Sequence, residues 1–166
     1  MQVKIRPATP EDVPVLFDLI CALAEYEHLS HLVTGSAELL QQHLFGPEAF
    51  ASALLAEVGG QAVGFALYFR NFSTFLTRPG IYLEDLFVLP EFRGRGIGKA
   101  LLARVAQEAV AKGYGRLEWM VLDWNQPAIE FYRRLGAKPH PEWILHRVVG
   151  AELEALARLA EDPYPS

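Results

Sequence analysis

Apolar and polar positions change period several times along the chain, which predicts a succession of short strands and amphipathic helices. Residues 3–6 alternate as a strand does, whereas the apolar positions within residues 13–24 recur at helical spacing. Residues 9–12, Thr-Pro-Glu-Asp, precede that helix with the pattern of a capping box and a proline at the first helical position. Residues 36–45 begin with a serine that can cap a second, shorter helix.

The middle of the chain predicts an antiparallel hairpin followed by a buried strand. Residues 53–58 and 62–69 are rich in apolar residues and flank the turn Gly59-Gly60. Residues 72–80 are polar and aromatic and predict a loop, and residues 81–88 predict a strand that Pro90 ends.

Helices and strands alternate in the rest of the chain. Helices are predicted over residues 96–112, 127–135 and 151–160, and strands over residues 116–122 and 143–149. An early hairpin with later β-α-β order predicts an α/β fold with a mixed sheet.

Composition narrows the class of protein. The chain has 166 residues, of which 51% are hydrophobic and 21% charged, and this fits a single domain spanning residues 1–166. The formal net charge of −5 disfavours nucleic acid as a partner and is compatible with a cationic substrate. The single cysteine, Cys21, and the lack of a signal-peptide core or a membrane-length apolar run predict a cytoplasmic protein.

One segment, residues 86–98, combines a buried strand, a glycine-rich turn and the start of a helix. The first N–H groups of a helix have no intrahelical partner and attract phosphate, and glycines let a ligand approach the backbone closely. The spacing of Gly94, Gly96 and Gly98 fits neither a dinucleotide-binding turn nor a Walker loop. An ordinary strand-to-helix turn is the alternative interpretation of this segment.

The flanking residues resemble a known superfamily. Arg93-Gly94-Arg95-Gly96-Ile97-Gly98 resembles the pyrophosphate loop of the GNAT acetyltransferases, and residues 125–132 resemble their Asn-x-x-Ala-x-x-Phe-Tyr helix. Further matches resemble the diamine (spermidine/spermine)/thialysine acetyltransferase branch. These matches are Arg6-Pro7-Ala8-Thr9, Tyr26-Glu27, Tyr82-Leu83-Glu84-Asp85, Trp124-Asn125 and Glu142-Trp143.

The resemblance implies a GNAT-like fold with a central mixed, mostly antiparallel sheet, a splayed strand and flanking helices. It also implies acetyl-CoA as co-substrate, a small-molecule amine as acceptor and a homodimer. Residues 72–76 carry no acid where polyamine enzymes of the branch have one, which favours a short diamine or a thialysine-like acceptor. The implied acetyl-CoA contacts are Leu86, Phe87, Val88, Arg93, Gly94, Arg95, Gly96, Ile97, Gly98, Lys99, Asn125, Pro127, Ala128 and Tyr132. The implied substrate contacts are Tyr26, Glu27, Glu84, Asp85, Glu142 and Trp143.

Acetyl transfer to an amine needs a group that removes a proton, since an ammonium with a pKa of ~10.4 is not a nucleophile. Glu84 is the candidate base, either directly or through water. In a regular strand it shares a face with Tyr82, Leu86 and Val88, while Asp85 faces the other way. Two adjacent acids in an apolar strand are costly to bury unpaired, so they indicate a cleft or, alternatively, a structural pair with an arginine.

Two further groups complete the expected chemistry. Tyr132 is the candidate proton donor to the leaving sulfur, because a phenol with a pKa of ~10 is reasonably matched to a thiol of ~8.5. The backbone N–H of Val88 is the candidate donor to the acyl carbonyl. The alternative role for Tyr132 is core packing, and Asn125 can cap its helix as well as bind the cofactor.

Other residue classes give weaker signals. Glu27 can equally be a solvated acid, and Trp143 a core residue. His28 and His31 are the closest histidines, and nothing joins them at a metal-binding spacing, so no metal is expected. Besides the diamine or thialysine-like acceptor, an amino acid, an aminoglycoside or a protein amine is an alternative. The alternative function is that of a non-catalytic CoA-binding regulatory domain.

Overall fold

The computed structural model describes residues 2–165, which divide into two compact units. The first unit ends at Met120, the second begins at Val121, and each is described by itself. No helix in this described part of the chain is long and apolar enough to cross a membrane. The strands are β1 (Val3–Pro7), β2 (Ala51–Val58), β3 (Gln61–Ser73), β4 (Arg78–Val88) and β5 (Leu117–Glu118). The α-helices are α1 (Val13–Tyr26), α2 (Ala37–Phe45), α3 (Ile97–Ala111), α4 (Gln126–Arg134) and α5 (Gly150–Ala157), and short 3₁₀ turns cover Pro10–Asp12, Ser30–Leu32 and Pro90–Phe92.

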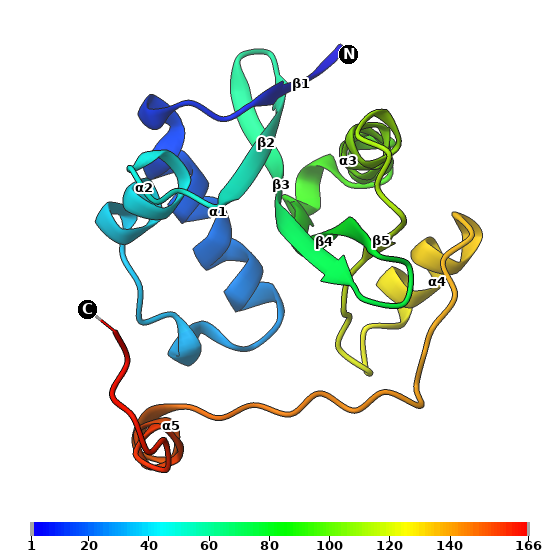
Figure 1. Ribbon diagram of the computed structural model, residues 1–166. Coiled ribbons are helices and arrows are strands. Elements are labelled where there is room, and N and C mark those ends of the chain that lie inside the picture. Colours follow the sequence, from blue (N-terminus) through cyan, green and yellow to red (C-terminus); the bar gives the residue numbers. More distant parts are fainter. Residues whose placement is uncertain (1, 166) are drawn as a thin grey trace. The chain divides into compact units, whose positions relative to one another are not determined.

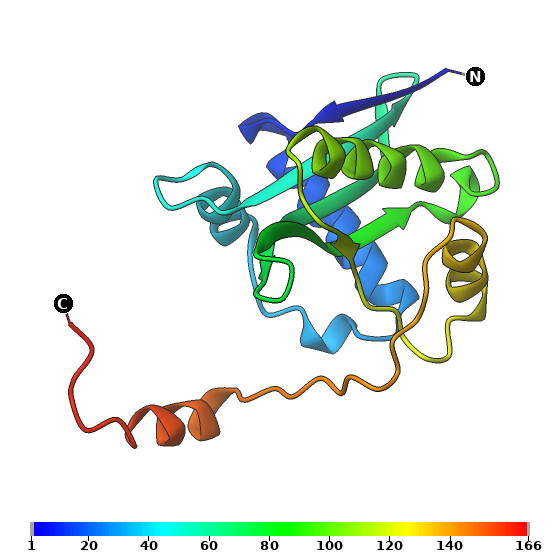
Figure 2. The same cartoon turned by 45° about the vertical axis from the view of Figure 1, so that its right-hand side comes forward.

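The first unit is a five-stranded sheet with helices on both faces (Figures 1 and 2). The strand order follows the sequence from β1 to β5, with antiparallel pairs up to β4 and a parallel pair between β4 and β5. Helices α1 and α2 lie on one face and α3 on the other. The expected α/β fold, with a mixed, mostly antiparallel sheet, is confirmed.

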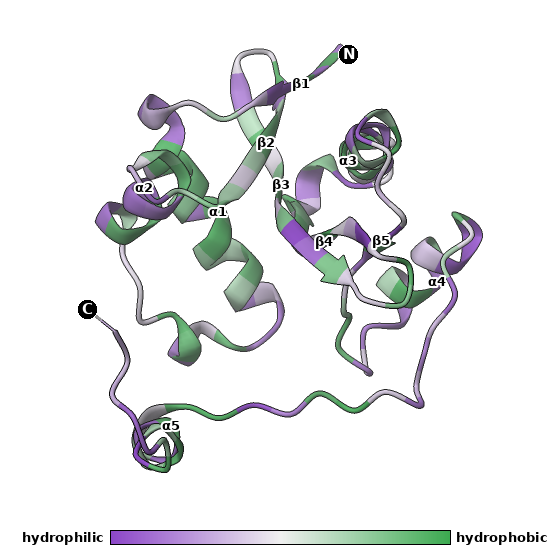
Figure 3. Cartoon of the chain, in the orientation of Figure 1, coloured by the Kyte–Doolittle hydropathy of each residue, from purple (hydrophilic) through white to green (hydrophobic). Residues whose placement is uncertain are grey.

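Apolar side chains on both faces of this sheet form the core. Leu16 and Leu19 of α1 pack against Phe65, Phe87 and Leu55 of the sheet, and all five are buried. Burying one such side chain contributes roughly 1.5–3 kcal/mol. Helix α3 covers the opposite face, and Figure 3 shows its mixed hydrophobic and polar sides. Its buried residues are Ile97, Leu101, Leu102, Val105 and Ala109.

Local signals at the helix starts hold as the sequence predicts. The Ser36 hydroxyl accepts the Leu39 N–H at 3.1 Å and caps α2. The Asp12 carboxylate accepts the Thr9 N–H at 2.7 Å in the capping box before α1. Gly59-Gly60 forms the hairpin turn in the left-handed region that glycine tolerates.

The predicted loop over residues 72–80 is wrong in extent. Strand β3 continues to Ser73 and β4 begins at Arg78, so the turn is limited to residues 74–77. Within it the Ser73 hydroxyl accepts the Leu76 N–H at 3.2 Å. The exposed polar and aromatic side chains made the ends of a paired hairpin look like a loop.

Two predicted strands are shorter than expected or absent, because a strand needs a hydrogen-bonded neighbour. Of residues 116–122, only Leu117–Glu118 pairs with β4. Residues 143–149 form no regular secondary structure, and no strand among the described residues pairs with them. The helix predicted over residues 151–160 is present as α5 and begins at Gly150.

Candidate active site

A β-bulge in β4 determines which side chains face α1. Leu67 of β3 is opposite Asp85, whereas the next residue of β3, Tyr68, is opposite Leu83. Glu84 is therefore an extra residue with no partner on β3, and it reverses the alternation beyond it. Directly opposed residues of antiparallel strands share a face, so Asp85 lies on the face of Leu67.

The bulge corrects the face assignment made from sequence. Phe87 is opposite Phe65, and Tyr82 is opposite Phe69, so both share the α1 face with Asp85. The sequence prediction, which assumed regular alternation, placed Glu84 on the face of Tyr82 and Asp85 on the opposite face. That prediction is wrong for Asp85. Sequence reasoning also omitted Tyr82 from the site. Its only signal was its place in the Tyr-Leu-Glu-Asp segment.

The carboxyl groups of Glu84 and Glu27 influence the ionisation of Asp85. Burial, followed by the charges of Glu84 and Glu27, raises the pKa of Asp85 to about 7 from its usual 3.8. Burial also raises the pKa of Glu27, which lies at the end of α1. Asp85 therefore changes charge near neutral pH, as a general base should. The described residues contain no cluster of His, Cys, Asp or Glu side chains that could hold a metal ion.

The edge of β4 beyond the bulge is open toward β5. Pairing between the two strands covers Ile81 and Tyr82 only. The Leu89 N–H donates to Val63 of β3 at 2.8 Å, so the N–H and C=O groups of Val88 and Leu86 point away from β3 by alternation. The Val88 carbonyl accepts from Arg93. The Val88 N–H and the Leu86 N–H and C=O face the same edge, where an extended ligand can pair with them.

The glycine-rich turn connects that edge to α3. Gly94 and Gly96 have φ angles of 76° and 79°, a conformation that favours glycine, and a Cβ built on either would meet no atom within 4 Å. No side chain caps the start of α3. Its first N–H groups can therefore donate hydrogen bonds to an anion, which the positive end of the helix dipole also attracts. Ile97 is buried below the turn, whereas Arg95 and Lys99 are exposed.

Arg93, at the start of this turn, is directed back toward the sheet. Its Nε donates to the Val88 carbonyl at 2.8 Å. Its guanidinium carbon lies 4.4 Å from the ring centre of Tyr26 and 5.4 Å from that of Phe87. One cation thus contacts the end of β4 and the end of α1.

The second unit holds the other predicted cofactor residues on α4. Asn125 is buried, and its side-chain oxygen accepts the Ala128 N–H at 3.3 Å, so its capping role is confirmed. Pro127 and Ala128 form the first turn of α4. Tyr132 is half-buried on the same helix, with its ring centre 5.4 Å from that of Phe131.

The two substrate candidates of the second unit lie after α4. Trp143 is 78% exposed, and Glu142 is also exposed, with its carboxylate 3.1 Å from the ring nitrogen of His140. The core role considered for Trp143 is therefore wrong. Ile144 and Leu145 beside it are exposed as well.

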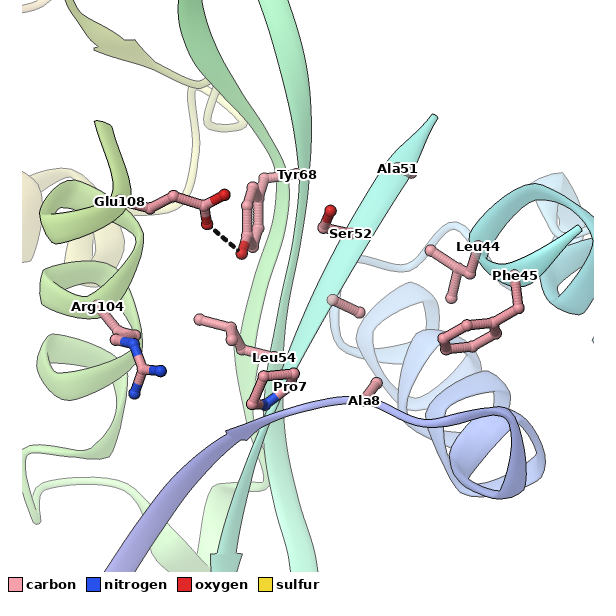
Figure 4. A pocket seen from close by; sticks show the side chains of 11 residues that line it. Pro7, Ala8, Leu44, Phe45, Ala51, Ser52, Leu54, Tyr68, Arg104 and Glu108 are labelled. Atoms are coloured by element: carbon pink, nitrogen blue, oxygen red, sulfur yellow. Dashed lines mark hydrogen bonds between the residues drawn. The ribbon is translucent and has the colours of Figure 1, made fainter. Parts of the chain in front are cut away.

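A separate cavity of about 300 Å³ lies where β1 ends beside β2 (Figure 4). The Tyr68 hydroxyl donates to Glu108 at 2.6 Å in its wall. Burial and this hydrogen bond raise the pKa of Tyr68, which therefore stays protonated. The lining contains none of the predicted site residues. It consists of Pro7, Ala8, Leu44, Phe45, Ala51, Ser52, Ala53, Leu54, Tyr68, Arg104 and Glu108.

Comparison with known proteins identifies the class that this fold and site define. Residues 18–137 match the acetyltransferase (GNAT) family. Thialysine N-epsilon-acetyltransferase of Bos taurus is 40% identical over 166 residues, covering 93% of this chain and 97% of that protein. L-ornithine N5-acetyltransferase NATA1 of Arabidopsis thaliana is 33% identical over 201 residues, covering 94% and 88%. The chain belongs to the GNAT family and is an N-acetyltransferase, and its likeness to the diamine/thialysine branch is confirmed.

Solved structures agree with this fold. The integron cassette protein VCH_CASS6 from the mobile metagenome of V. cholerae aligns with a TM-score of 0.80 at 26% identity, covering 95% of this chain and 99% of that chain. Aminoglycoside acetyltransferase meta-AAC0020, from an uncultured soil metagenomic sample and in complex with sisomicin, aligns with a TM-score of 0.73 at 21% identity. That alignment covers 89% of this chain and 95% of the other, and it shows the fold alone.

The raised pKa of Asp85 predicts a stability change for Asp85→Asn. The folded chain keeps this proton to about pH 7, whereas an unfolded carboxyl loses it near 3.8. Folding must therefore take up a proton between these values, and the free energy of unfolding falls as the pH rises through them. Asp85→Asn should raise the free energy of unfolding at pH 8 by on the order of 2–4 kcal/mol and leave it unchanged at pH 4.

Urea unfolding at both pH values measures this difference. Asp18→Asn, at an exposed acid of α1, is the matched control and should change neither value. An equal gain for Asp85→Asn at both pH values would assign the effect to packing instead of ionisation.

Proposed function

We propose that this chain transfers the acetyl group of acetyl-CoA directly, in a ternary complex, to a primary amine of a small molecule. The observation that carries the proposal is the position of Asp85. It lies on the strand whose open edge presents Val88, and its carboxyl changes charge near pH 7. A proton acceptor and a donor to an acyl oxygen thus belong to one short segment of β4.

The residues at the glycine-rich turn fit acetyl-CoA. Gly94 and Gly96 leave space where a side chain would stand, the start of α3 suits a pyrophosphate, and Arg95 and Lys99 add positive charge. The backbone of Leu86 can pair with the amides of an extended pantetheine arm. Bound there, acetyl-CoA supplies an activated thioester.

The chain's own groups then have separate tasks. The Val88 N–H donates to the acyl oxygen as negative charge develops on it. Asp85 takes the proton that the ammonium group must lose, directly or through water. Glu84, the base expected from sequence, raises the pKa of Asp85 by its charge, and Glu27 contributes to the same effect. The three acids attract a cationic amine before it loses its proton.

Tyr132 gives a proton to the leaving sulfur, so that the new C–N bond forms as the C–S bond breaks. Asn125 shapes the first turn of α4, and Pro127 and Ala128 provide the surface of that turn. Tyr26, Glu142 and Trp143 remain proposed contacts of the amine.

The acceptor class follows from the relatives. Two of them are named for thialysine and L-ornithine, which are amino acids that carry a terminal side-chain amine. The turn at residues 74–77 has no acid to hold the far end of a long polyamine, and Phe75 at its tip is 96% exposed. We therefore favour a basic amino acid of this type or a short diamine over an aminoglycoside, a protein amine or a non-catalytic CoA sensor.

CoA release measured across a panel of amines tests this function. The panel holds thialysine, ornithine, putrescine, spermidine, an aminoglycoside and a short lysine peptide. Saturable turnover should appear with thialysine, ornithine or putrescine and be weaker with spermidine, and Asp85→Asn should lower it about a hundredfold or more. Tight acetyl-CoA binding without turnover for any amine would favour the CoA sensor.

Tyr132→Phe removes the proposed proton donor while keeping the ring. Turnover should fall roughly a hundredfold, whereas the calorimetric Kd for acetyl-CoA should change less than about twofold. Tyr164→Phe, at a tyrosine that is 95% exposed, serves as the control. Unchanged turnover in Tyr132→Phe would exclude the donor role.

We further propose a homodimer, as the resemblance implies. Its support is the apolar surface of the second unit, where Trp143, Ile144, Val149 and Leu159 are exposed and Figure 3 shows hydrophobic stretches before α5. Sedimentation equilibrium that returned the 18.5 kDa mass of one chain would contradict this. The unpaired Cys21 supports a reducing compartment, and a cytoplasmic location stays a prediction.

A further inference from the structure

The side chain of Arg93 joins two parts of the site that come from distant sequence positions. Val88 is the last residue of β4, and Tyr26 is the last residue of α1. The guanidinium donates to the Val88 carbonyl at 2.8 Å and lies over the Tyr26 ring at 4.4 Å. The ring centres of Tyr26 and Phe87 are 6.4 Å apart. The end of α1, the end of β4 and the Arg93 cation therefore form one packed group.

The hydrogen bond determines the geometry of the proposed acyl side. The N–H and C=O of an extended residue point to the same edge of a strand, so the Val88 carbonyl lies on the open edge beside its own N–H. Arg93 satisfies that carbonyl, and Val63 accepts the following N–H, that of Leu89, at 2.8 Å. The peptide after Val88 is thereby held on both sides. This restricts the backbone rotation at Val88, whose own N–H belongs to the preceding peptide.

The ring contact determines the position of the proposed amine side. Glu27 follows Tyr26 directly, and its charge is one of the causes that raise the pKa of Asp85. A planar guanidinium can stack on an aromatic face and donate through Nε in the same pose, which an ammonium cannot. Replacing Arg93 would therefore remove one contact at the end of β4 and one at the end of α1.

We propose that Arg93 is a positioning residue that keeps Val88 and the Tyr26–Glu27 end of α1 in register across the site, and that it is not a phosphate ligand. This inference rests on the proposed function for its kinetic consequence only. Arg93 is exposed. The opposite result would be a side chain that turns outward and binds the pyrophosphate.

Two variants each remove a different property of the side chain, and the proposal requires both properties. Arg93→Lys keeps the charge and loses the planar face and Nε, whereas Arg93→Gln keeps a planar donor and loses the charge. Arg95→Gln is the comparator for a lost phosphate contact. Arg116→Gln, at an arginine that pairs with Glu118 at 3.1 Å, controls for the loss of a positive charge.

Both Arg93 variants should lower kcat/KM for the amine about tenfold to a hundredfold, because small displacements of reacting groups have effects of that size. The calorimetric Kd for CoA should change less than about twofold, whereas Arg95→Gln should weaken it more. In the ligand-free protein, Arg93→Lys should also shift the ¹³C resonance of the Val88 carbonyl, which loses its donor.

A CoA Kd that weakens as much as kcat/KM falls would overturn the proposal and make Arg93 a phosphate ligand. An unshifted Val88 carbonyl would overturn it as well. If the wild-type chain turned over no amine, the proposed function would fail, while the CoA Kd and the Val88 resonance would still decide the role of Arg93. If Arg93→Gln did not fold, Arg93→Lys would provide the same two readouts.

Discussion

The rest of the site depends on the single extra residue in β4. Glu84 has no partner on β3, and this reverses the direction of every side chain and peptide group that follows. The reversal places Asp85 on the face covered by α1 and directs the backbone of Val88 to the edge where β5 is no longer paired. Without the bulge, the Asp85 side chain would lie on the opposite face of the sheet and the Val88 N–H would point toward β3.

The electrostatics of the α1 face follow from that placement. Asp85, Glu84 and Glu27 bring three acids together, and burial makes the ionised form of Asp85 unfavourable. Such a cluster lowers stability at neutral pH, and a bound ammonium would relieve it. A site that is strained without its cation and able to accept a proton near pH 7 suits an enzyme that deprotonates amines. The Arg93 guanidinium stacks on the Tyr26 ring and donates to the Val88 carbonyl. It thereby keeps the end of α1 and the end of β4 aligned across this site.

Sequence predicted the architecture better than it predicted the strand details. The strand, glycine turn and helix around Gly94 and Gly96 were recognisable, because left-handed φ angles and a free helix start require that composition. The bulge was not, because Glu84 and Asp85 satisfy a regular alternation equally well and only pairing with Leu67 distinguishes them. Residues 143–149 have strand-like composition, but composition cannot supply the hydrogen-bonded neighbour that a strand requires. The direction of the Arg93 side chain was equally hidden, since the family motif suggests a phosphate contact and only the folded structure brings the side chain to Val88.

The titration of the Asp85 carboxyl carbon, followed by NMR, tests the central claim most directly. A resonance that titrates with a midpoint near 7, and moves to a lower pH in Glu84→Gln, would agree with a buried acid raised by its neighbours. A midpoint near 4 would mean that Asp85 is already ionised and solvated. It could then act as an amine contact, but the role of proton acceptor in this site would be lost.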